Sequence, residues 1–281
     1  MILVTGANGN VGRELVEQLL AAGEKTRVMV RDERKAGNLK NRVEIAVGDF
    51  DKPETLTAAM SGIQRMFLLS VGPANEPIVN AIEAAGRAGV RHVAFLSSMG
   101  SNLDPAPQMG KWHKEKEQLI ESSGLEWTFL RPGMFMSNTL QWAETIKSQA
   151  AVYFPTGEGE CAPIDPRDIA AVAATVLTTP GHEGRAYELT GTELLTARQQ
   201  TEILASVLNK PIRYFDIAPE AFAEKMKNNG VPQFLADGLK EVMEGVRSGR
   251  VAIVTQNVEQ VTGRTPGSFE DWCRRQKGAF Q

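Results

Sequence analysis

The sequence predicts an α/β fold, a doubly wound parallel sheet followed by a smaller, mainly helical C-terminal lobe. Six short apolar segments in the first 132 residues alternate with helical patterns, and such alternation builds a parallel sheet with helices on both faces. The six segments are almost continuously apolar, which is typical of strands buried on both faces. A glycine-rich turn also separates the first strand from the first helix.

The expected elements follow one another regularly. The strands are 2–5, 27–30, 43–47, 66–70, 92–98 and 127–132. The helices between them are 11–23, 52–62, 76–89 and 111–124. Each helix has apolar residues three to four apart, and most end in a glycine that can cap the helix. Residues 1–132 therefore form the expected sheet domain.

The pattern changes after residue 132. Helices are expected at 137–149, 165–179, 197–208 and 219–246, with a short strand at 187–191. These elements are too short and too interleaved to form a core of their own. We therefore expect residues 133–281 to form a lobe, interleaved with the sheet domain, that closes over the carboxyl ends of the strands, where open α/β sheets bind ligands.

Composition indicates a protein that acts on a small molecule. Of the 281 residues 42% are hydrophobic and 23% charged, and the net charge of −3 comes with scattered basic residues, so nucleic acid and membrane partners are not expected. Cys161 and Cys273 belong to no Cys/His cluster, so no metal site is expected. The first strand begins at residue 2, and no apolar run has the length of a membrane span. We therefore expect a cytoplasmic location.

The segment GANGNVG, residues 6–12, predicts a dinucleotide site. Gly6 permits a tight turn, Gly9 lets the backbone approach a pyrophosphate, and Gly12 allows close packing of the helix, whose free N–H groups suit anionic oxygens. The spacing is GxxGxxG instead of GxGxxG, and a plain turn is the alternative. The order of strand, glycines and helix favours the dinucleotide. The residues expected to contact it are Gly6, Ala7, Asn8, Gly9, Asn10, Val11 and Gly12.

The end of the second strand indicates which dinucleotide binds. NAD sites usually place an acidic residue there, whereas this strand is followed by Arg31. Arg31 can pair with a 2′-phosphate, joined by Arg34 or Lys35. A solvated charge cluster is the alternative. We expect NADP(H), and Asp32 leaves NAD(H) as a second cofactor.

Two further strand ends supply candidate cofactor contacts. Asp49 can accept a hydrogen bond from the adenine amino group, with Phe50 beside the ring. Asp51 is instead expected to form a capping box with Glu54 at the next helix. After the fourth and fifth strands, residues 70–72, which include Ser70 and Val71, and residues 97–99 would flank the nicotinamide ribose. Ordinary turn chemistry is the alternative for these two segments.

The chain resembles the short-chain dehydrogenase/reductase superfamily, specifically its atypical NmrA-like branch. The motifs that carry the resemblance are GANGNVG, GDF (48–50), LRPGMFMSN (130–138), DPRDIAAVA (165–173), YELTG (187–191) and VTGRTPGSFEDW (261–272). Within the branch it looks most like type 2 quinone oxidoreductases, triphenylmethane reductases and NADPH azoreductases. The resemblance implies a Rossmann core and an acceptor pocket. We expect cofactor contacts from Gly133, Met134 and Phe135, and a pocket lined by Met99, Met136, Asn138 and Trp142, although methionines are common in cores.

The family's proton donor is missing. Typical members carry a tyrosine, a lysine four residues later and a glutamate four residues after that, and these positions match Met109, His113 and Glu117. Methionine cannot titrate, so alcohol/ketone chemistry through a tyrosinate is not expected. His113 shares a helix side with Glu117. A surface pair, a nicotinamide-ribose contact and acid catalysis are the alternatives for His113, and the ribose contact is favoured.

These observations predict an NAD(P)H-dependent reductase that prefers NADPH. It would transfer hydride to an electron-poor, aromatic or conjugated acceptor of the quinone, azo or triphenylmethane dye type, which needs little acid assistance because the product anion is delocalised. The alternative is an NADP(H)-binding redox sensor without turnover. A homodimer is a further expectation.

Overall fold

The computed structural model describes residues 1–281 and divides into two compact units. The first unit comprises Met1–Asn102, Gly110–Pro132 and Pro166–Glu188. The second comprises Leu103–Met109, Gly133–Asp165 and Leu189–Gln281. The chain therefore leaves the first unit after residue 132 and returns to it for residues 166–188.

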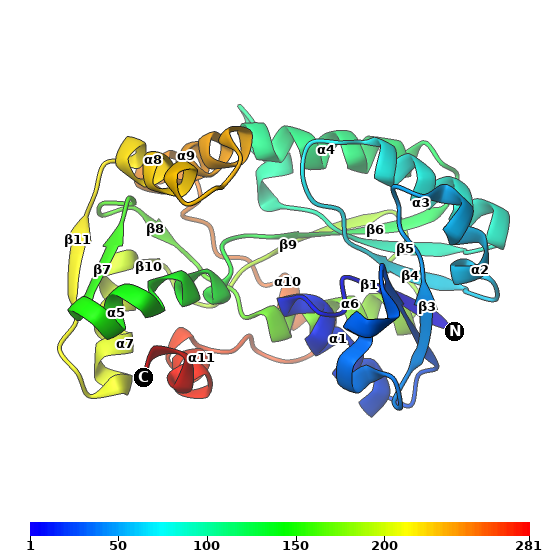
Figure 1. Cartoon of the computed structure of the whole chain (residues 1–281), viewed down its shortest axis with the longest axis horizontal. Helices are drawn as coiled ribbons and strands as arrows, with labels where there is room; N and C mark the ends of the chain where they lie inside the picture. The colour runs from blue at the N-terminus through cyan, green and yellow to red at the C-terminus, as the bar shows by residue number, and fades with distance from the viewer. The chain divides into compact units, whose positions relative to one another are not determined.

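A seven-stranded sheet with the strand order β3-β2-β1-β4-β5-β6-β9 forms the first unit (Figure 1). Every pair among the first six strands is parallel. The order reverses between β1 and β4, and open α/β sheets bind ligands beyond the carboxyl ends of the strands at such a point. The predicted doubly wound α/β fold is confirmed. The strands are β1 (Ile2–Thr5), β2 (Thr26–Val30), β3 (Glu44–Val47), β4 (Arg65–Leu68), β5 (His92–Leu96), β6 (Glu126–Pro132) and β9 (Arg185–Leu189).

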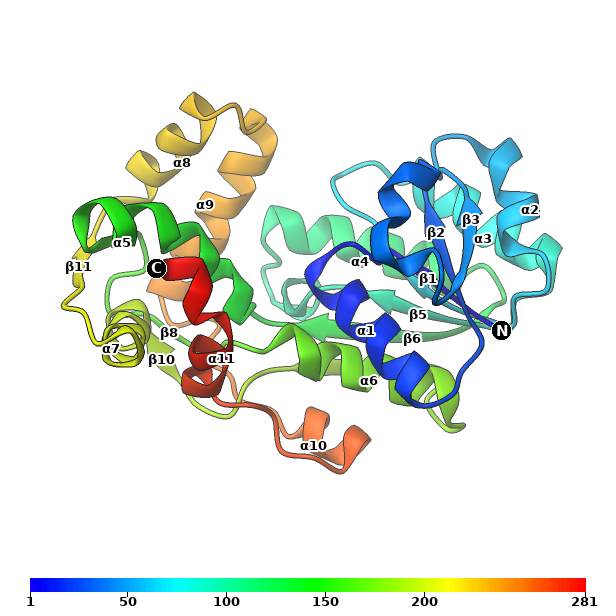
Figure 2. The same cartoon turned by 60° about the horizontal axis from the view of Figure 1, so that its bottom comes forward.

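Helices cover both faces of this sheet (Figure 2). On one face α1 (Asn10–Ala21) packs against α6 (Pro166–Thr178), and α6 also contacts β4, β5 and β6. Eight of the thirteen residues of α6 are buried, because the helix lies between the sheet and a second helix. This packing explains why α6 belongs to the sheet unit. The remaining helical segments are η1 (Glu33–Leu39), η2 (Pro53–Thr55), α2 (Leu56–Met60), α3 (Glu76–Ala88), η3 (Met99–Asn102) and α4 (Gln108–Glu121).

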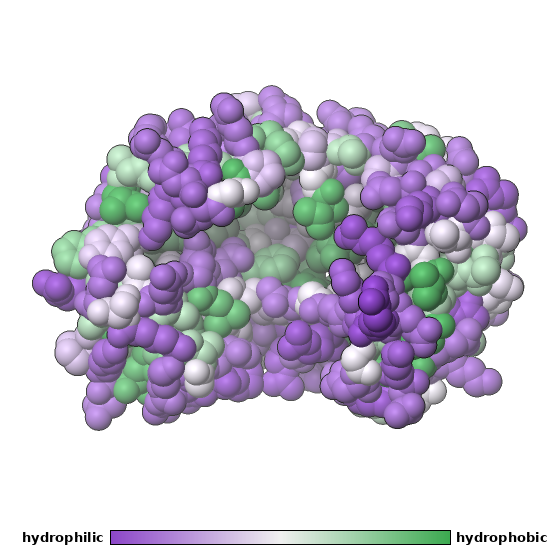
Figure 3. Space-filling model, viewed as in Figure 1, coloured by the Kyte–Doolittle hydropathy of each residue, from purple (hydrophilic) through white to green (hydrophobic).

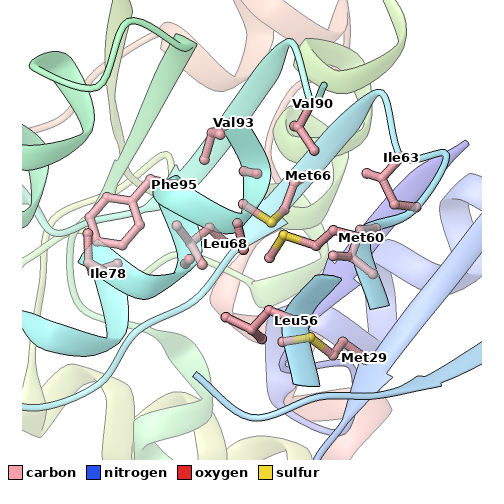
Figure 4. Close-up of a cluster of buried hydrophobic side chains, with 14 of the residues drawn as sticks. Met29, Leu56, Met60, Ile63, Met66, Leu68, Ile78, Val90, Val93 and Phe95 are labelled. Carbon is pink, nitrogen blue, oxygen red and sulfur yellow. The ribbon is translucent and has the colours of Figure 1, made fainter. Parts of the chain in front are cut away.

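The core on the other face lies between the sheet and helices α2, α3 and α4. Met66 and Leu68 of β4 and Phe95 of β5 point toward Met60 and Ile78 of the helices (Figure 4). All five side chains are fully buried. Burial of a side chain of this size contributes about 1.5 to 3 kcal/mol, so this cluster fixes the strand ends that carry the site.

The capping box predicted for Asp51 and Glu54 is wrong. Lys52 occupies the N-cap of η2 and makes no side-chain cap bond. Thr55 Oγ1 instead accepts from the Asp49 N–H at 2.9 Å, and Asp49 Oδ1 accepts from the Asp51 N–H at 3.2 Å. These local bonds close a turn around Asp49, and one of them satisfies the Asp51 N–H group that the capping box would have used.

The second unit combines two small sheets with short helices. Strand β8 (Glu160–Cys161) pairs antiparallel with β10 (Leu195–Thr196), and β7 (Ala151–Phe154) pairs parallel with β11 (Arg213–Asp216). The helical segments are η4 (Met136–Trp142), α5 (Ala143–Gln149), α7 (Ala197–Leu208), α8 (Pro219–Asn228), α9 (Gln233–Arg247), α10 (Asn257–Thr262), α11 (Phe269–Gln276) and η5 (Lys277–Phe280).

Local sequence explains the boundaries of these helices. Thr196 and Gln199 form a capping box at the start of α7. The helical segment expected at 219–246 is two helices, because Gly230, at φ 83°, and Pro232 lie between α8 and α9. Trp142, Phe154 and Phe269 belong to an apolar core within this unit, so the expectation that these elements form no core of their own is wrong.

No helix has both the length and the apolar character needed to cross a bilayer. On the face of the molecule in Figure 3, hydrophilic residues predominate and hydrophobic residues form small groups.

Candidate functional site

The glycine-rich turn joins the ends of β1 and β4 so closely that two of its glycines have no room for a side chain. Gly6 has a φ of +66°, and a Cβ atom there would lie 2.4 Å from Leu69 Cδ2. A Cβ atom on Gly12 would lie 2.2 Å from the Gly6 carbonyl oxygen. Thr5 Oγ1 donates to the Phe67 carbonyl at 3.0 Å and accepts from the Leu69 N–H at 2.9 Å. The glycine-rich turn and the ends of β1 and β4 are therefore tightly packed against one another.

Gly9 differs from the other two glycines because a Cβ atom there would meet a single atom, at a longer distance. It is the N-cap of α1, and no side chain caps this helix. A Cβ atom on Gly9 would approach only the Gly6 carbonyl oxygen, at 3.2 Å. An uncapped helix N-terminus beside bare backbone is suited to an anionic group such as a phosphate.

A cavity of about 390 Å³ opens next to this turn. Residues at the ends of β1, β2, β3 and β4 line it. These residues are far apart in the sequence, and the sheet brings them together. The predicted residues that line it are Gly6, Ala7, Asn8, Gly9, Arg31, Lys35, Asp49, Phe50, Ser70 and Val71. The lining residues that sequence reasoning did not select for this role are Thr5, Met29, Val30, Gly48, Asp51, Leu69 and Pro77. The predicted Asn10, Val11 and Gly12 form the first turn of α1 instead.

The cationic end of this cavity is defined by the loop after β2. Asp32 caps η1 and binds Arg34 through both carboxylate oxygens, at 3.0 Å or 3.1 Å from Nε and 2.6 Å from Nη2. This pairing holds Asp32 as a carboxylate bound to Arg34, and Arg34 does not line the cavity. Arg31 and Lys35 do line it, and neither forms an ion pair. Asn8 Nδ2 donates to the Lys35 carbonyl at 2.9 Å and ties this loop to the glycine turn.

The loop after β4 is held by helix α4. The Lys116 side chain is only 1% exposed, and its Nζ donates to the Gly72 carbonyl at 2.7 Å and to the Trp112 carbonyl at 3.4 Å. Burial lowers the pKa of Lys116. Asn75, at the end of the same loop, donates to Glu115 Oε2 at 3.0 Å. Sequence reasoning missed Lys116, since a lysine in a charged helix gives no local sign of burial.

His113 occupies the same helix but makes no contact with Glu117 of the kind expected. Its Nδ1 is buried without a hydrogen-bond partner, and its ring lies 6.2 Å from that of Phe95. Burial, aided by the Lys116 ammonium group, lowers the pKa of His113 to about 4. The imidazole is therefore neutral at neutral pH, a state that suits a hydrogen-bonding group better than a proton donor.

Glu117 is fully buried and serves other partners. It accepts from Ser97 Oγ at 2.6 Å and Ser101 Oγ at 3.0 Å, and it binds Arg131. Burial alone would raise the pKa of Glu117, but the bonds from Arg131 and Ser97 outweigh burial and lower it. The carboxylate therefore fixes the segment after β5, where Met99 is buried.

The second unit contains a small cavity of its own. Its lining includes four residues that the sequence singled out, Met134, Phe135, Asn138 and Trp142. Met136 does not line it and lies in the core at 1% exposure, and Gly133 donates from its backbone to the Leu189 carbonyl at 2.9 Å. Other lining residues carried no signal in the sequence because they come from separate elements, and they include Thr156, Cys161 and Gln200.

Comparisons with known proteins agree with this geometry. Residues 6–180 match the NAD(P)H-binding family model. The chain is 37% identical over 283 residues to the NAD(P)H azoreductase of Xenophilus azovorans, covering 100% of this chain and 99% of that protein. It is 38% identical over 281 residues to the (4-alkanoyl-5-oxo-2,5-dihydrofuran-3-yl)methyl phosphate reductase of Streptomyces griseus, with coverage of 100% and 99%.

A solved structure extends the similarity to three dimensions. The NADPH complex of the quinone oxidoreductase QOR2 from Escherichia coli superposes with a TM-score of 0.88 at 28% identity, covering 98% of this chain and 99% of that one. The chain therefore belongs to the NAD(P)H-binding family and is an NAD(P)H-dependent reductase. The predicted family resemblance and cofactor class are confirmed.

Proposed function

We propose that this reductase prefers NADPH and transfers hydride to a flat, electron-poor conjugated acceptor, such as a quinone or an azo compound. The observation that carries the proposal is the 390 Å³ cavity, in which an uncapped helix N-terminus, two unpaired cations and the glycine turn converge. The helix N-terminus and the glycine turn would hold the pyrophosphate of a dinucleotide, and the two cations would select its 2′-phosphate.

The residues present fit NADPH better than NADH. In NAD sites an acidic side chain after the second strand binds the ribose 2′-OH. Here Asp32 is paired with Arg34, while Arg31 and Lys35 face the cavity without a carboxylate partner. A guanidinium group forms charge-assisted hydrogen bonds to phosphate, and these are about twice as strong as neutral ones. Arg31 and Lys35 would therefore hold the 2′-phosphate.

The remaining cavity residues would each bind a different part of the cofactor. Gly9 and the first turn of α1 would receive the pyrophosphate, Asp49 and Phe50 the adenine, and the loop of Ser70 and Val71 the nicotinamide ribose. NADPH supplies the hydride when bound. The protein's part is to hold the donor and the acceptor at about 3 to 3.5 Å from each other and to exclude competing reactions.

Conjugated acceptors match the absence of an acid at the family's tyrosine position. Met109 cannot donate a proton, and His113 is neutral at neutral pH. A quinone or azo acceptor is electrophilic without protonation, and its reduced form is a delocalised anion that can take a proton from water. The activities of the relatives support this choice, because one reduces azo compounds, one acts on quinones, and the substrate of the third carries oxo and alkanoyl groups on a dihydrofuran ring.

The test is oxidation of NADPH followed at 340 nm with a panel of a naphthoquinone, an azo dye, an alkanoyl butenolide and a triphenylmethane dye. Steady turnover with at least one conjugated acceptor supports the proposal. Stoichiometric binding of NADPH without turnover on any acceptor contradicts it and favours a redox sensor.

Two companion predictions complete the proposal. We expect the protein to act in the cytoplasm, which fractionation of cells expressing it with a small tag would check. We also expect a homodimer, which light scattering coupled to size-exclusion chromatography would distinguish from a 30.6 kDa monomer.

A further inference from the structure

Asp32, in the loop after β2, lies next to the cofactor cavity but not in its lining. Arg31 and Lys35, which flank it in the sequence, both line the cavity. In NAD sites an acidic side chain at this end of the second strand accepts a hydrogen bond from the ribose 2′-hydroxyl. Asp32 is therefore a carboxylate close to the place where NADH would need one, yet its oxygens are bound elsewhere.

Both carboxylate oxygens of Asp32 are occupied within the loop. Oδ1 accepts from the Arg34 backbone N–H at 2.9 Å and so caps η1. Oδ2 accepts from Arg34 Nε at 3.0 Å and from Arg34 Nη2 at 2.6 Å. The backbone bond would form with any residue except proline at position 34. The bonds to Oδ2, in contrast, depend entirely on the arginine side chain.

The Arg34 side chain binds Asp32 and otherwise faces solvent. It is 90% exposed, whereas the Asp32 side chain is 31% exposed. The hydrogen bonds between them lower the pKa of Asp32 and raise the pKa of Arg34. An ion pair as exposed as this one adds little to the stability of a protein. The stability of the fold therefore does not account for the pair, and its effect on the neighbouring cations is the more informative property.

A free Asp32 carboxylate would compete for the cations of the cavity. The Lys35 N–H donates to the Asp32 carbonyl at 2.9 Å, so the two residues lie within one turn of the chain. Besides Arg34, the charge of Lys35 also lowers the pKa of Asp32. A carboxylate released from Arg34 would be attracted to Lys35 and would repel a 2′-phosphate. By binding Asp32, Arg34 leaves Lys35 available to the cofactor.

We propose that Arg34 sets the cofactor preference without touching the cofactor, because it withholds Asp32 from the ribose of NADH and leaves Arg31 and Lys35 to the 2′-phosphate of NADPH. Arg34 is thus a positioning residue that acts through Asp32. The inference rests on the NADPH preference in the proposed function. NADH would have to break the bonds from Arg34 before Asp32 could accept from its 2′-hydroxyl, whereas NADPH would not.

The first experiment is calorimetric titration of Arg34→Ala with NADPH and with NADH. Alanine keeps the backbone N–H that Asp32 caps. The affinity for NADPH should fall about tenfold, the worth of one hydrogen bond to a charged group, and the affinity for NADH should rise. General damage to the site would not move the two affinities in opposite directions. Lys40→Ala is the charge-matched control, because Lys40 ends the same loop but binds Glu33.

The second experiment asks whether Arg34 acts through Asp32. Asp32→Asn keeps a side-chain oxygen that can cap η1 but removes the negative charge. The double variant Asp32→Asn/Arg34→Ala should regain the NADPH affinity that Arg34→Ala loses, and it should not show the gain for NADH. Such dependence of one substitution on another identifies a coupled pair. Arg34→Lys keeps a cation for Asp32 and should retain most of the preference for NADPH.

Two results would overturn the inference. If NADPH weakens equally in Arg34→Ala and in the double variant while NADH is unaffected, Arg34 binds the 2′-phosphate itself. If Lys40→Ala reproduces the effect of Arg34→Ala, the net charge of the loop decides the preference. Should Arg34→Ala not fold, Arg34→Gln, which keeps a long side chain without the charge, provides the same comparison.

The outcome for the proposed function is separate. The titrations require no acceptor, so a protein that turns over none of the acceptors contradicts the reductase proposal while the inference is still decided by binding. Equal affinity of the wild-type protein for both cofactors contradicts the NADPH preference itself. A wild-type preference for NADPH that Arg34→Ala leaves unchanged overturns the inference alone.

Discussion

Arg131 binds the carboxylate of Glu117 through two parallel hydrogen bonds, Nε to Oε1 at 2.8 Å and Nη2 to Oε2 at 2.7 Å. The pair joins the end of β6 to the middle of α4. Ser97 and Ser101 complete the shell of Glu117. The carboxylate is therefore fully engaged, which explains why His113, one helical turn earlier, remains without it.

Replacement of Glu117 by glutamine should destabilise the protein strongly. Glu117→Gln takes from the Arg131 guanidinium, which is 11% exposed, the carboxylate that binds it directly, and breaking a buried pair in this way costs about 3 to 5 kcal/mol. Urea denaturation would measure the loss. Glu121→Gln, at an exposed position of the same helix, is the control: it removes only a weak coulombic attraction to Arg131 and should change stability little. Equal stability of the two variants would show that the pair contributes nothing net.

His113→Gln should raise the KM for NADPH with only a modest change in kcat, because we expect His113 to orient the cofactor and not to donate a proton. A pKa of about 4 means that wild-type kcat should show no limb between pH 5.5 and 8 that depends on His113. The pH profiles of kcat for both proteins with a quinone would decide. A limb near pH 6.5 that disappears in the variant, with a fall in kcat of about 10² or more, would make His113 the acid.

The same lowered pKa makes stability depend on pH. The unfolded histidine takes up a proton near pH 6.5 and the folded one near pH 4, so between these values the unfolded state binds more protons. The wild-type protein should therefore lose stability as the pH falls from 6.5 to 4, and His113→Gln should lose less. Thermal unfolding at several pH values would show the difference between the two proteins.

Arg31→Ala should weaken NADPH selectively. Loss of its charge-assisted bonds to the 2′-phosphate should cost about 1.5 to 3 kcal/mol, whereas NADH should be almost unaffected. Calorimetric titration with both cofactors measures this. Lys40→Ala removes a nearby cation that pairs with Glu33 and does not line the cavity, so it should leave both affinities unchanged. Equal losses for the two cofactors in Arg31→Ala would remove its role as discriminator.

Gly9→Val should abolish NADPH binding in a protein that still folds. The new Cβ atom would meet only the Gly6 carbonyl oxygen, at 3.2 Å, but the branched side chain would extend into the space that we assign to the pyrophosphate. Gly12→Ala should instead disrupt the turn itself, because its Cβ atom would lie 2.2 Å from the same oxygen. Circular dichroism and cofactor titration distinguish the two. If folded Gly9→Val binds NADPH with full affinity, the pyrophosphate does not bind at this turn.

Lys116→Met should impair the nicotinamide side of the cofactor site. Removal of the Nζ donor frees the Gly72 carbonyl and with it the loop of Ser70 and Val71, so we expect NADPH affinity to fall about tenfold, the worth of one to two hydrogen bonds. Adenosine 2′,5′-bisphosphate, which reaches only the Arg31 end, should bind as before. Lys111→Met, at an exposed position of α4, is the control. If Lys116→Met lowers the affinity for adenosine 2′,5′-bisphosphate as much as that for NADPH, the substitution has disturbed the whole cofactor site and not the nicotinamide side alone.

The sequence alone predicted the fold and much of the dinucleotide cavity, because those features are local. Buried parallel strands show as continuous apolar runs, and the turn after β1 shows as three glycines at fixed spacing. Arg31, Asp49 and Ser70 could be selected because each follows a strand, and carboxyl ends of parallel strands meet at one edge of a sheet.

Tertiary structure decided what depends on partners distant in the sequence. Asp32 and Arg34 are both charged residues of one loop, and only their mutual pairing leaves Arg31 and Lys35 to the cavity. Lys116 looks like a solvated residue of a charged helix, yet the Gly72 carbonyl lies 44 residues away and makes its burial tolerable. The small cavity of the second unit likewise forms only when Thr156 and Gln200, from other elements, lie beside Trp142. Burial and hydrogen-bond satisfaction are properties of the folded neighbourhood, so no local pattern of residues encodes them.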